Sequence, residues 1–329
     1  LYVKGSGWDL ETIEAPGFSP VRLDYVRRLA GLSSLPDPQM VNELVTHMTR
    51  AGAPAPSVET ILHASLPYRY VDHTHADAIL SITNAPDGEA RIREIYGDRV
   101  VVIPYVMPGF DLAALCAREF PKQAGKNTVG MALMNHGIFS FGDTARESYE
   151  RMIALVGEAE AYLQKHKSWS MELSAPVASE IDSTEVAALR RSVSDVAGMP
   201  MILSVRENPA LLAFARRPDV ARISQQGPVT PDHIIRTKKV PMLGRDVAGF
   251  ARSYREYFDR NAPLAREKKA MLDPAPRMVL DPAFGFAGIG RTAKDAAIVA
   301  ELYEHSVEVF LRAEGLGGWN ALPERDLFE

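Results

Sequence analysis

Cysteine is almost missing from this sequence of 329 residues, in which Cys116 is the single example. One thiol excludes an intrachain disulfide and a zinc site built from thiolates, and it is typical of a reducing compartment. No apolar run approaches the roughly 20 residues that cross a bilayer, and the opening LYVKGSGWDLE does not form a signal peptide. We therefore expect a cytoplasmic protein in which any metal is held by histidines and carboxylates.

An excess of positive charge is missing as well. The formal net charge is −5 and the basic residues are scattered, which excludes the electrostatic footprint of a nucleic-acid-binding protein. The length is sufficient for two domains, and 46% hydrophobic with 24% charged residues is ordinary for a globular chain. We expect a small molecule or another protein as the partner, with no role for nucleic acid or membrane.

Strand-like and helix-like patterns alternate along the first half. Residues 1–35 predict a strand, a glycine-rich turn and a loop, and the β-branched residues of 98–107 predict a buried strand. VGMALMNHGIFSFGD (129–143) predicts two short strands joined at Asn-His-Gly. Helices are expected at 36–52, at 57–66, in FDLAALCAREF and in TARESYERMIALVGEAEAYLQKHK. This alternation predicts an α/β fold with a layered core.

Part of the first half recurs in the second. At a constant offset, GIFSFGDTARE (137–147) matches GFAGIGRTAKD (285–295) at two glycines, a threonine and an alanine, and a long helix follows each. Looser similarity sets VDHTHAD beside PDHIIRT (231–237) and VIPYVMPGFDLAAL beside KVPMLGRDVAGF. We expect a duplication, and therefore interpret GFAGIG as a strand rather than as a dinucleotide-binding loop.

The clearest change in composition falls at 168–195, where a Ser/Pro/Ala-rich stretch (WSMELSAPVASEIDS) predicts a linker. This boundary divides the chain into a first domain at 1–170 and a related second half at 176–329.

Three histidines and a glutamate are the candidate metal ligands. His73 and His75 are two residues apart, so on an extended segment both rings project from the same face. His136 is a third candidate, because the glycine of Asn-His-Gly permits an irregular backbone. Glu59 can add an oxygen ligand or act as a base. Each pattern is common by chance, and their combination is what favours a metal site.

The looser alignment has a consequence for metal binding in the second half. It sets His73 opposite His233, while His75 falls opposite Ile235. His136 falls opposite Phe284 in the same alignment. The second copy has therefore lost two of three imidazoles, and we expect it to hold no catalytic metal.

PSVETILHASLP, VDHTHADAI and LMNHGIFSFG, in this order after an opening VKGSG, resemble the class II aldolase/adducin family over about residues 1–165. The whole chain, including its ending YEHSVEVFLRAEGLGGWNALPERDLFE, is most similar to the aldolase portion of bifunctional rhamnulose-1-phosphate aldolase/alcohol dehydrogenases. Those proteins continue into a short-chain dehydrogenase domain. The resemblance implies that this chain is part of a longer protein with such a fused domain.

The resemblance also assigns roles to matching positions. The three zinc-binding histidines of the family fall on His73, His75 and His136, and its catalytic glutamate falls on Glu59. A tyrosine that serves as proton donor from a neighbouring subunit falls on Tyr105, which implies a homo-oligomer. Zinc suits three imidazoles and a carboxylate best, and manganese, cobalt and iron are alternatives.

The substrate phosphate has a less complete match. The phosphate-binding Ser-Gly of the family falls on Ser6 and Gly7, where the main-chain N–H groups from Lys4 onward can form an anion nest. The first serine of its S-S-E falls on Ser57, whereas the second is Val58 here, which removes a hydroxyl donor. Asn- and Thr-containing phosphate loops that precede KGSG in the family have no counterpart in this chain.

The activity implied is metal-dependent retro-aldol cleavage of a phosphorylated ketose, like that of rhamnulose 1-phosphate, to dihydroxyacetone phosphate and an aldehyde. Two alternatives stay open, a pentulose-phosphate 4-epimerase-type activity and a non-catalytic, adducin-like interaction module. The basic cluster RTKK (236–239) also has two interpretations, a solvated loop or a source of cations for a phosphate. His63, one helical turn after Glu59, is interpreted as a packing or orienting residue.

Overall fold

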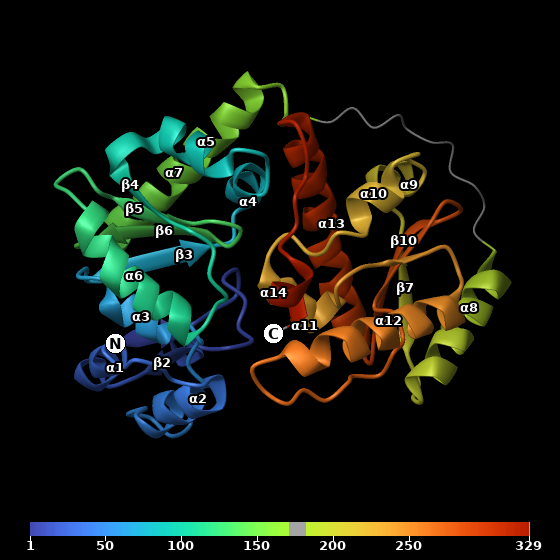
Figure 1. Ribbon diagram of the computed structural model, residues 1–329, viewed down its shortest axis with the longest axis horizontal. Helices are drawn as coiled ribbons and strands as arrows, with labels where there is room; N and C mark the ends of the chain where they lie inside the picture. Colours follow the sequence, from blue (N-terminus) through green and yellow to red (C-terminus); the bar gives the residue numbers. More distant parts are fainter. Residues whose placement is uncertain (171–181, 329) are drawn as a thin grey trace. The chain divides into compact units, whose positions relative to one another are not determined.

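The structure, a computed structural model, describes residues 1–170 and 182–328 (Figure 1). The chain divides into two compact units, Leu1–Thr74 with Glu89–Glu158, and His75–Gly88 with Ala159–Glu329. The segment His75–Gly88 thus packs with the second half of the chain although it lies early in the sequence. Most of the expected linker, 171–181, lies outside the described residues. Its last part forms a helix instead, α8 at Ser183–Ala197.

The first unit is built on a four-stranded sheet in the order β3-β6-β5-β4. Its strands are β3 Tyr70–Thr74, β4 Val100–Ile103, β5 Gly130–Leu133 and β6 Gly137–Gly142. β6 runs antiparallel to β3 and to β5, whereas β4 is parallel to β5. The central strands β5 and β6 are buried along their whole length, and the edge strand β3 is only partly covered. The strands expected within 98–107 and 129–143 are confirmed.

Helices cover both faces of this sheet, which gives three layers (Figure 1). One face carries α3 Thr60–Ser65 and α6 Phe110–Gln123, and the other carries α5 Gly88–Tyr96 and α7 Ala145–Lys165. The remaining elements are β1 Tyr2–Lys4, β2 Phe18–Pro20, α1 Leu23–Leu29 and α2 Asp37–Thr46, with short 3-10 turns at Ala15–Gly17 and Gly97–Arg99. The loop expected up to residue 35 was wrong at α1, whose Val26 and Leu29 are buried in the core.

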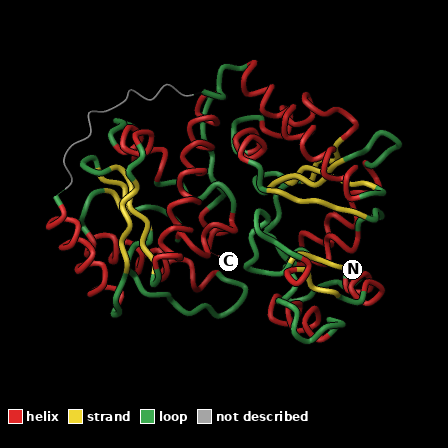
Figure 2. The backbone as a smooth tube through the Cα atoms, turned by 180° about the vertical axis from the view of Figure 1, so that it is seen from behind, coloured by secondary structure: helices red, strands yellow, loops and turns green. Residues whose placement is uncertain are grey.

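The second unit contains a sheet of the same design, in the order β7-β10-β9-β8. Its strands are β7 Ile202–Arg206, β8 Met242–Leu243, β9 Met278–Asp281 and β10 Gly285–Gly290. β10 is antiparallel to both neighbours, and β8 is parallel to β9, as in the first sheet. Figure 2, in which strands are yellow and helices red, shows each sheet flanked by helices.

α13, Ala293–Gly315, lies along one face of this sheet, and α12, Val247–Asn261, pairs with α8 on the other. The early helix α4, Asp77–Thr83, packs on α13, where Asp77 Oδ2 lies 2.7 Å from His305 Nδ1. The remaining helices are α9 Pro209–Ala215, α10 Val220–Ser224, α11 Ile234–Thr237 and α14 Glu324–Phe328, with 3-10 turns at Pro231–His233 and Ala262–Leu264. No helix among the described residues is both long enough and apolar enough to span a bilayer.

The shared topology confirms the duplication, and local geometry explains which residues match. Gly142 ends β6, and a Cβ there would lie 2.6 Å from the main-chain nitrogen of Ser148 at the start of α7. Gly290, which lies 148 residues later, would clash in the same way at 2.5 Å with the nitrogen of Ala296 in α13. In both units the helix approaches the strand so closely that only glycine fits.

The helix caps repeat at the same offset. Thr144 Oγ1 accepts a hydrogen bond from the N–H of Glu147 at 3.1 Å, and Thr292 Oγ1 accepts one from the N–H of Asp295 at 3.1 Å. The threonine and the acidic residue three positions on form a capping pair at the start of each long helix. The matched positions in the sequence are therefore those with a local structural requirement.

One part of the expected alignment was wrong. In the first sheet His73 pairs with Phe139, whose counterpart at the common offset is Ala287. In the second sheet Ala287 pairs with Val205, so the counterpart of His73 is Val205. His233 lies instead in a 3-10 turn outside the sheet. The resemblance between VDHTHAD and PDHIIRT is a coincidence of composition that strand pairing does not support.

Candidate metal centre

The edge strand β3 and the connection between β5 and β6 bring histidines together in the first unit. His73 lies on β3, and its ring stacks on Phe139 of β6 at a centroid distance of 4.0 Å. His73 Nδ1 lies 3.0 Å from the main-chain oxygen of Ile138. Because a carbonyl oxygen can only accept, Nδ1 carries the proton and Nε2 presents its lone pair. The fold thus prepares His73 to bind through Nε2.

His136 is fixed by the turn that joins the two central strands. It is 2% exposed, and its N–H donates to the oxygen of Leu133 at 3.2 Å. The irregular residue in this turn is Asn135, with a φ of 57°, whereas Gly137 is an ordinary member of β6. The expectation that glycine supplies the irregular backbone was therefore wrong, since asparagine tolerates the left-handed region well enough to do so.

Glu59 faces both of these histidines from the start of α3. Its Oε1 lies 3.3 Å from His73 Nε2 and 3.3 Å from His136 Nε2. Burial raises the pKa of the Glu59 carboxyl, but His73 and His136 outweigh burial and hold the pKa well below its usual range. The carboxylate is ionised and can act as a ligand or as a proton acceptor.

His75 follows the end of β3 and completes the cluster. One ligand atom from each of Glu59, His73, His75 and His136 lies within 4.8 Å of the others. Ligand atoms about 2.0–2.2 Å from a shared ion lie about 3.4 Å apart in a tetrahedral arrangement, close to the spacing around Glu59 Oε1. The donor set and its spacing fit a divalent ion such as zinc.

One further contact of the cluster was not expected from the sequence. His75 Nε2 lies 3.9 Å from Asp232 Oδ2, and both residues belong to the second unit. Asp232 stands in the PDHIIRT segment, in which the sequence comparison singled out the histidine and not this acid. His63, on α3, packs against the ring of Phe139 at 5.3 Å, and burial lowers its pKa to about 4, so the ring is neutral at pH 7.

The turn expected at a phosphate follows a segment that pairs with the chain leading into Glu59, since the N–H of Ser57 donates to the oxygen of Lys4 at 3.3 Å. Ser6 and Gly7 form an exposed turn, with a φ of 83° at Gly7. The N–H groups of Gly5 and Ser6 already donate to the oxygens of Gly17 and Ala55, both at 2.8 Å. Two of the N–H groups expected in an anion nest are thus engaged, which leaves the Ser6 hydroxyl and the amides from Gly7 onward.

Ser57 and Tyr105 also have defined surroundings. Ser57 Oγ accepts a hydrogen bond of 3.2 Å from the N–H of Glu59 and so helps to fix the start of α3. Tyr105 follows β4, and its hydroxyl lies 3.9 Å from Met107 Sδ.

The counterparts of these ligands in the second unit cannot hold an ion in the same way. Val205 replaces His73, as strand pairing shows, and Phe284 stands at the common offset from His136. A guanidinium occupies this neighbourhood, since Arg245 lies 5.7 Å from the ring centre of Phe284. Arg245 bonds to Asp281 at 2.7 Å and to Glu185 at 2.6 Å. A fixed cation of the chain thus bridges Asp281 at the end of β9 and Glu185 on α8.

The sequence as a whole matches known families along most of its length. Residues 1–163 match the Class II Aldolase and Adducin N-terminal domain, and residues 180–329 match the second domain of class II aldolase. The chain belongs to the class II aldolase/adducin family. The Glu/His cluster and the mixed sheet with helices on both faces are therefore features of a member of that family.

Two relatives illustrate the range of this similarity. The chain is 32% identical over 353 residues to "Uncharacterized oxidoreductase YuxG" of Bacillus subtilis (strain 168), covering 100% of this chain and 50% of that protein. The chain thus spans half the length of this relative. It is also 43% identical to the solved N-terminal class II aldolase domain of a conserved protein from Thermoplasma acidophilum, covering 49% of this chain and 73% of that one, with a TM-score of 0.45.

Proposed function

We propose that this protein cleaves a phosphorylated ketose by a metal-dependent retro-aldol reaction, of the kind that converts rhamnulose 1-phosphate to dihydroxyacetone phosphate and lactaldehyde. The observation that carries the proposal is the convergence of Glu59, His73, His75 and His136. A protein that only served as a scaffold would have no use for four convergent metal-capable side chains. Zinc is the ion that suits this donor set best, with manganese, cobalt or iron as alternatives.

The chemistry that a bound divalent ion supplies is stabilisation of the negative charge that develops on substrate oxygens as the carbon–carbon bond breaks. Tyr105, from a neighbouring subunit, removes the proton of the hydroxyl on the carbon that becomes the aldehyde. The electron pair of the broken bond stays with the ketose fragment. Glu59, which is ionised in the resting site, first takes up a substrate hydroxyl proton and then delivers a proton to that carbon, so the cleavage needs no oxidant or reductant.

The remaining residues position the substrate and the ligands. The hydrogen bond from His73 Nδ1 to Ile138 fixes the ring orientation that this reaction requires. We assign the substrate phosphate to the exposed turn at Ser6 and Gly7, with Ser57 beside Glu59 as a further donor. With Val58 in place of a serine, this site offers one hydroxyl fewer than the family pattern.

The longer relative supports a bifunctional context. The chain covers 50% of a protein whose name is oxidoreductase, which is consistent with an aldolase portion followed by a dehydrogenase. We propose that the aldehyde released at the Glu59 cluster is the substrate of such a fused domain in the full-length protein.

The first experiment combines metal analysis with an activity assay on the purified chain. Elemental analysis is expected to find about one divalent ion per chain. His75→Ala should lose the ion together with retro-aldol activity on rhamnulose 1-phosphate. His166→Ala, which changes an exposed histidine outside the cluster, is the matched control and should keep both.

The contrary results are equally specific. If wild-type protein holds no ion and shows no cleavage after zinc or manganese is added, the catalytic proposal fails and an adducin-like interaction role is favoured. If the ion is present and the substrate is converted to an epimer without net cleavage, the epimerase alternative is correct instead.

A further inference from the structure

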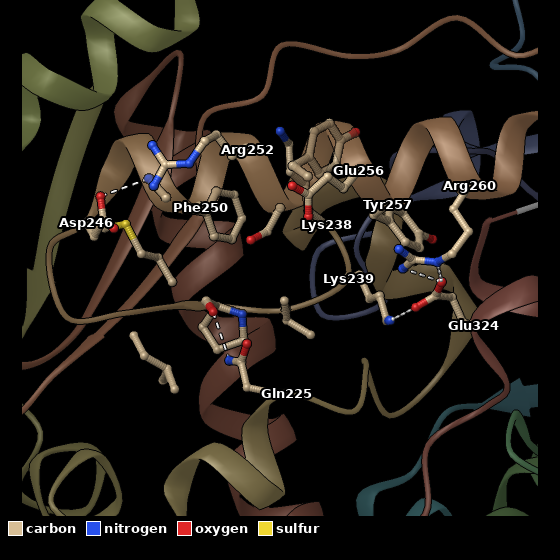
Figure 3. Close-up of a pocket in the computed structure, with 17 residues that line it drawn as sticks. Gln225, Lys238, Lys239, Asp246, Phe250, Arg252, Glu256, Tyr257, Arg260 and Glu324 are labelled. Carbon is tan, nitrogen blue, oxygen red and sulfur yellow. Dashed lines mark hydrogen bonds and ion pairs between the residues drawn. The ribbon is translucent and has the colours of Figure 1, made fainter.

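A cavity of about 570 Å³ lies within the second unit (Figure 3). Its walls are the segment Lys238–Leu243 and the helix α12, and Gln225 and Glu324 also line it. The volume falls within the roughly 300–1,000 Å³ of small-molecule sites. None of the residues proposed for the aldol reaction lines it, so its use must be explained separately.

The helical wall of this cavity is an aromatic stripe. Phe250, Tyr254 and Tyr257 recur at spacings of four and three residues, which puts them on one face of α12. Opposite them, Val240, Pro241, Met242 and Leu243 complete an apolar surface. Such walls favour the flat or apolar body of an organic molecule over a hydrated ion.

Lys238 is the most unusual residue of the lining. Its φ of 60° and ψ of −174° lie in a region that is essentially restricted to glycine. Its side chain is only 5% exposed, with Nζ 3.9 Å above the ring of Tyr254. A strained, buried lysine in a cavity wall is the kind of feature that persists at ligand sites.

The amine of Lys238 has no acidic partner of its own. It donates to the main-chain oxygen of Asp273, while the Asp273 carboxylate is bonded to Arg277. Within 1–170 and 182–328, no carboxylate forms an ion pair with Lys238. Burial, followed by the nearby Arg277, lowers the pKa of the Lys238 amine to about 7 against the opposing Asp273.

Tyr257 offers a second polar group. Its hydroxyl oxygen is buried, and it has no hydrogen-bond partner among the described residues. A buried hydroxyl without a partner is costly, and a ligand oxygen at this point would remove the cost. The stripe therefore carries a donor beside its apolar surface.

Two of the three acids of the cavity, Asp246 and Glu324, are already engaged by groups of the protein. Asp246 accepts the N–H of Gly249 at 2.8 Å and caps α12. Glu324 accepts from Arg260 at 2.7 Å, from Asn261 at 2.9 Å and also from Lys239. Four basic and three acidic side chains line the cavity: Lys238, Lys239, Arg252, Arg260, Asp246, Glu256 and Glu324. With Lys238 protonated, one positive charge is in excess.

We propose that this cavity is a binding site for a small organic anion, whose charged oxygens meet the Lys238 amine and the Tyr257 hydroxyl and whose planar or apolar body packs on the α12 stripe. The head group can be a carboxylate or a phosphate ester, since both present the same charge-assisted acceptor. The site is independent of the Glu59 cluster, and the second unit thereby gains a role that needs no metal.

The proposal predicts that binding takes up a proton. Around pH 7 a large share of the Lys238 amine is neutral, and an anion binds the protonated form. The groups that face this amine are the Tyr254 ring from α12 and Asp273 and Arg277 from the following segment. Affinity should therefore fall as the pH rises from 7 to 9, by up to about tenfold per unit.

Benzoate is a suitable probe, because its ring fits the stripe and its charge is constant over this pH range. Titration calorimetry of the full chain should show saturable binding of benzoate, at least about tenfold tighter than neutral benzamide or inorganic phosphate. Methyl phosphate and phenyl phosphate then distinguish a preference for the phosphate head. Lys238→Met should weaken benzoate by about tenfold or more, and Tyr257→Phe should weaken it less.

Lys268→Met, which removes an exposed lysine in the same unit, is the matched control and should bind like wild type. His75→Ala should also bind benzoate normally, which separates this test from the aldolase proposal. If Lys238→Met does not fold, the pH series on wild-type protein decides the question. Equal binding of benzoate and benzamide, affinity independent of pH, or no saturable binding would each overturn the proposal.

Discussion

At the scale of single residues, Glu59 is the side chain whose role in the proposed reaction most needs a test. An ionised carboxylate at 3.3 Å from two imidazole nitrogens can ligate an ion or carry a proton, and one oxygen cannot do both at once. The aldolase proposal gives Glu59 the second role, with the ion held by His73, His75 and His136. Metal ligation and proton transfer by Glu59 can be distinguished with a neutral side chain of the same shape, which cannot carry the proton.

Glu59→Gln tests this assignment directly. The amide keeps the size of the side chain and removes its charge, so three imidazoles should still hold the ion. We expect kcat to fall by about 10²–10⁴-fold, the usual contribution of a general base, while metal content stays near the wild-type value. Elemental analysis and steady-state kinetics measure both. Loss of the ion in this variant would show that Glu59 is an essential ligand, and Glu150→Gln on the exposed face of α7 is the control.

Asn135 has an equally specific place, since its left-handed backbone sets the direction in which His136 enters the cluster. A β-branched side chain is strongly disfavoured at a φ of 57°. Asn135→Val should cost about 1–2 kcal/mol of stability and weaken metal binding. Asn135→Gly should disturb the turn less, because glycine accepts this conformation. Urea unfolding and metal titration of the two variants check this order, and equal effects of both would contradict it.

At the scale of elements, the short turn at Pro231–His233 ends in a half-buried histidine. Burial lowers the pKa of His233 to about 4, and the nearby His305 acts in the same direction. Asp232 and Asp77 oppose this by raising the pKa, but their effect is smaller than that of burial. A histidine that is neutral in the folded protein and titrates near 6.5 when unfolded makes the unfolded state bind more protons between these values. The second unit should therefore lose stability as the pH falls.

The pH range of this loss of stability follows from the pKa values of His233 in the unfolded and folded protein. Stability contributed by neutral His233 is complete above pH 6.5 and declines toward pH 4, by at most about 3 kcal/mol. His233→Gln, which does not titrate, should flatten this decline. Urea unfolding between pH 4 and 7, followed by hydrogen exchange at β7 to β10, measures it. An identical pH profile for the variant would show that other groups cause the acid sensitivity.

At the scale of the whole molecule, two units share one architecture but differ in what fixes the ends of their central strands. The first unit gathers imidazoles and a carboxylate, and the second bridges Asp281 and Glu185 with the guanidinium of Arg245. Each unit has its own buried hydrophobic cluster. A metal ion should therefore affect the stability of the units unequally.

Removal of the ion with a chelator is expected to destabilise the strands of the first sheet. A ligand at 100 times its dissociation constant stabilises a fold by about 2.7 kcal/mol, which chelation would withdraw. Hydrogen exchange should speed up at β3, β5 and β6, whereas β7, β9 and β10 should change little. Equal acceleration in both sheets would contradict this division, and His75→Ala without chelator should reproduce the first pattern.

The sequence by itself determined the features that depend on local rules. Strand periodicity, the repeated capping pairs and the glycines beneath α7 and α13 follow from contacts within a few residues, so the layered fold and the duplication could be predicted. His73, His75, His136 and Glu59 could be named because their residue types and their order in the chain resemble a known family. Metal chemistry restricts the possible ligands to few side chains, so these four stand out.

Only the tertiary structure decided which distant residues meet. Strand pairing made Val205 the counterpart of His73 and left His233 in a turn, because register depends on a partner strand that no local pattern specifies. The same holds for Asp232 beside His75 and for the cavity at Lys238. These contacts join different segments of the chain, and their energy comes from burial and charge pairing, which appear only once the second unit has folded.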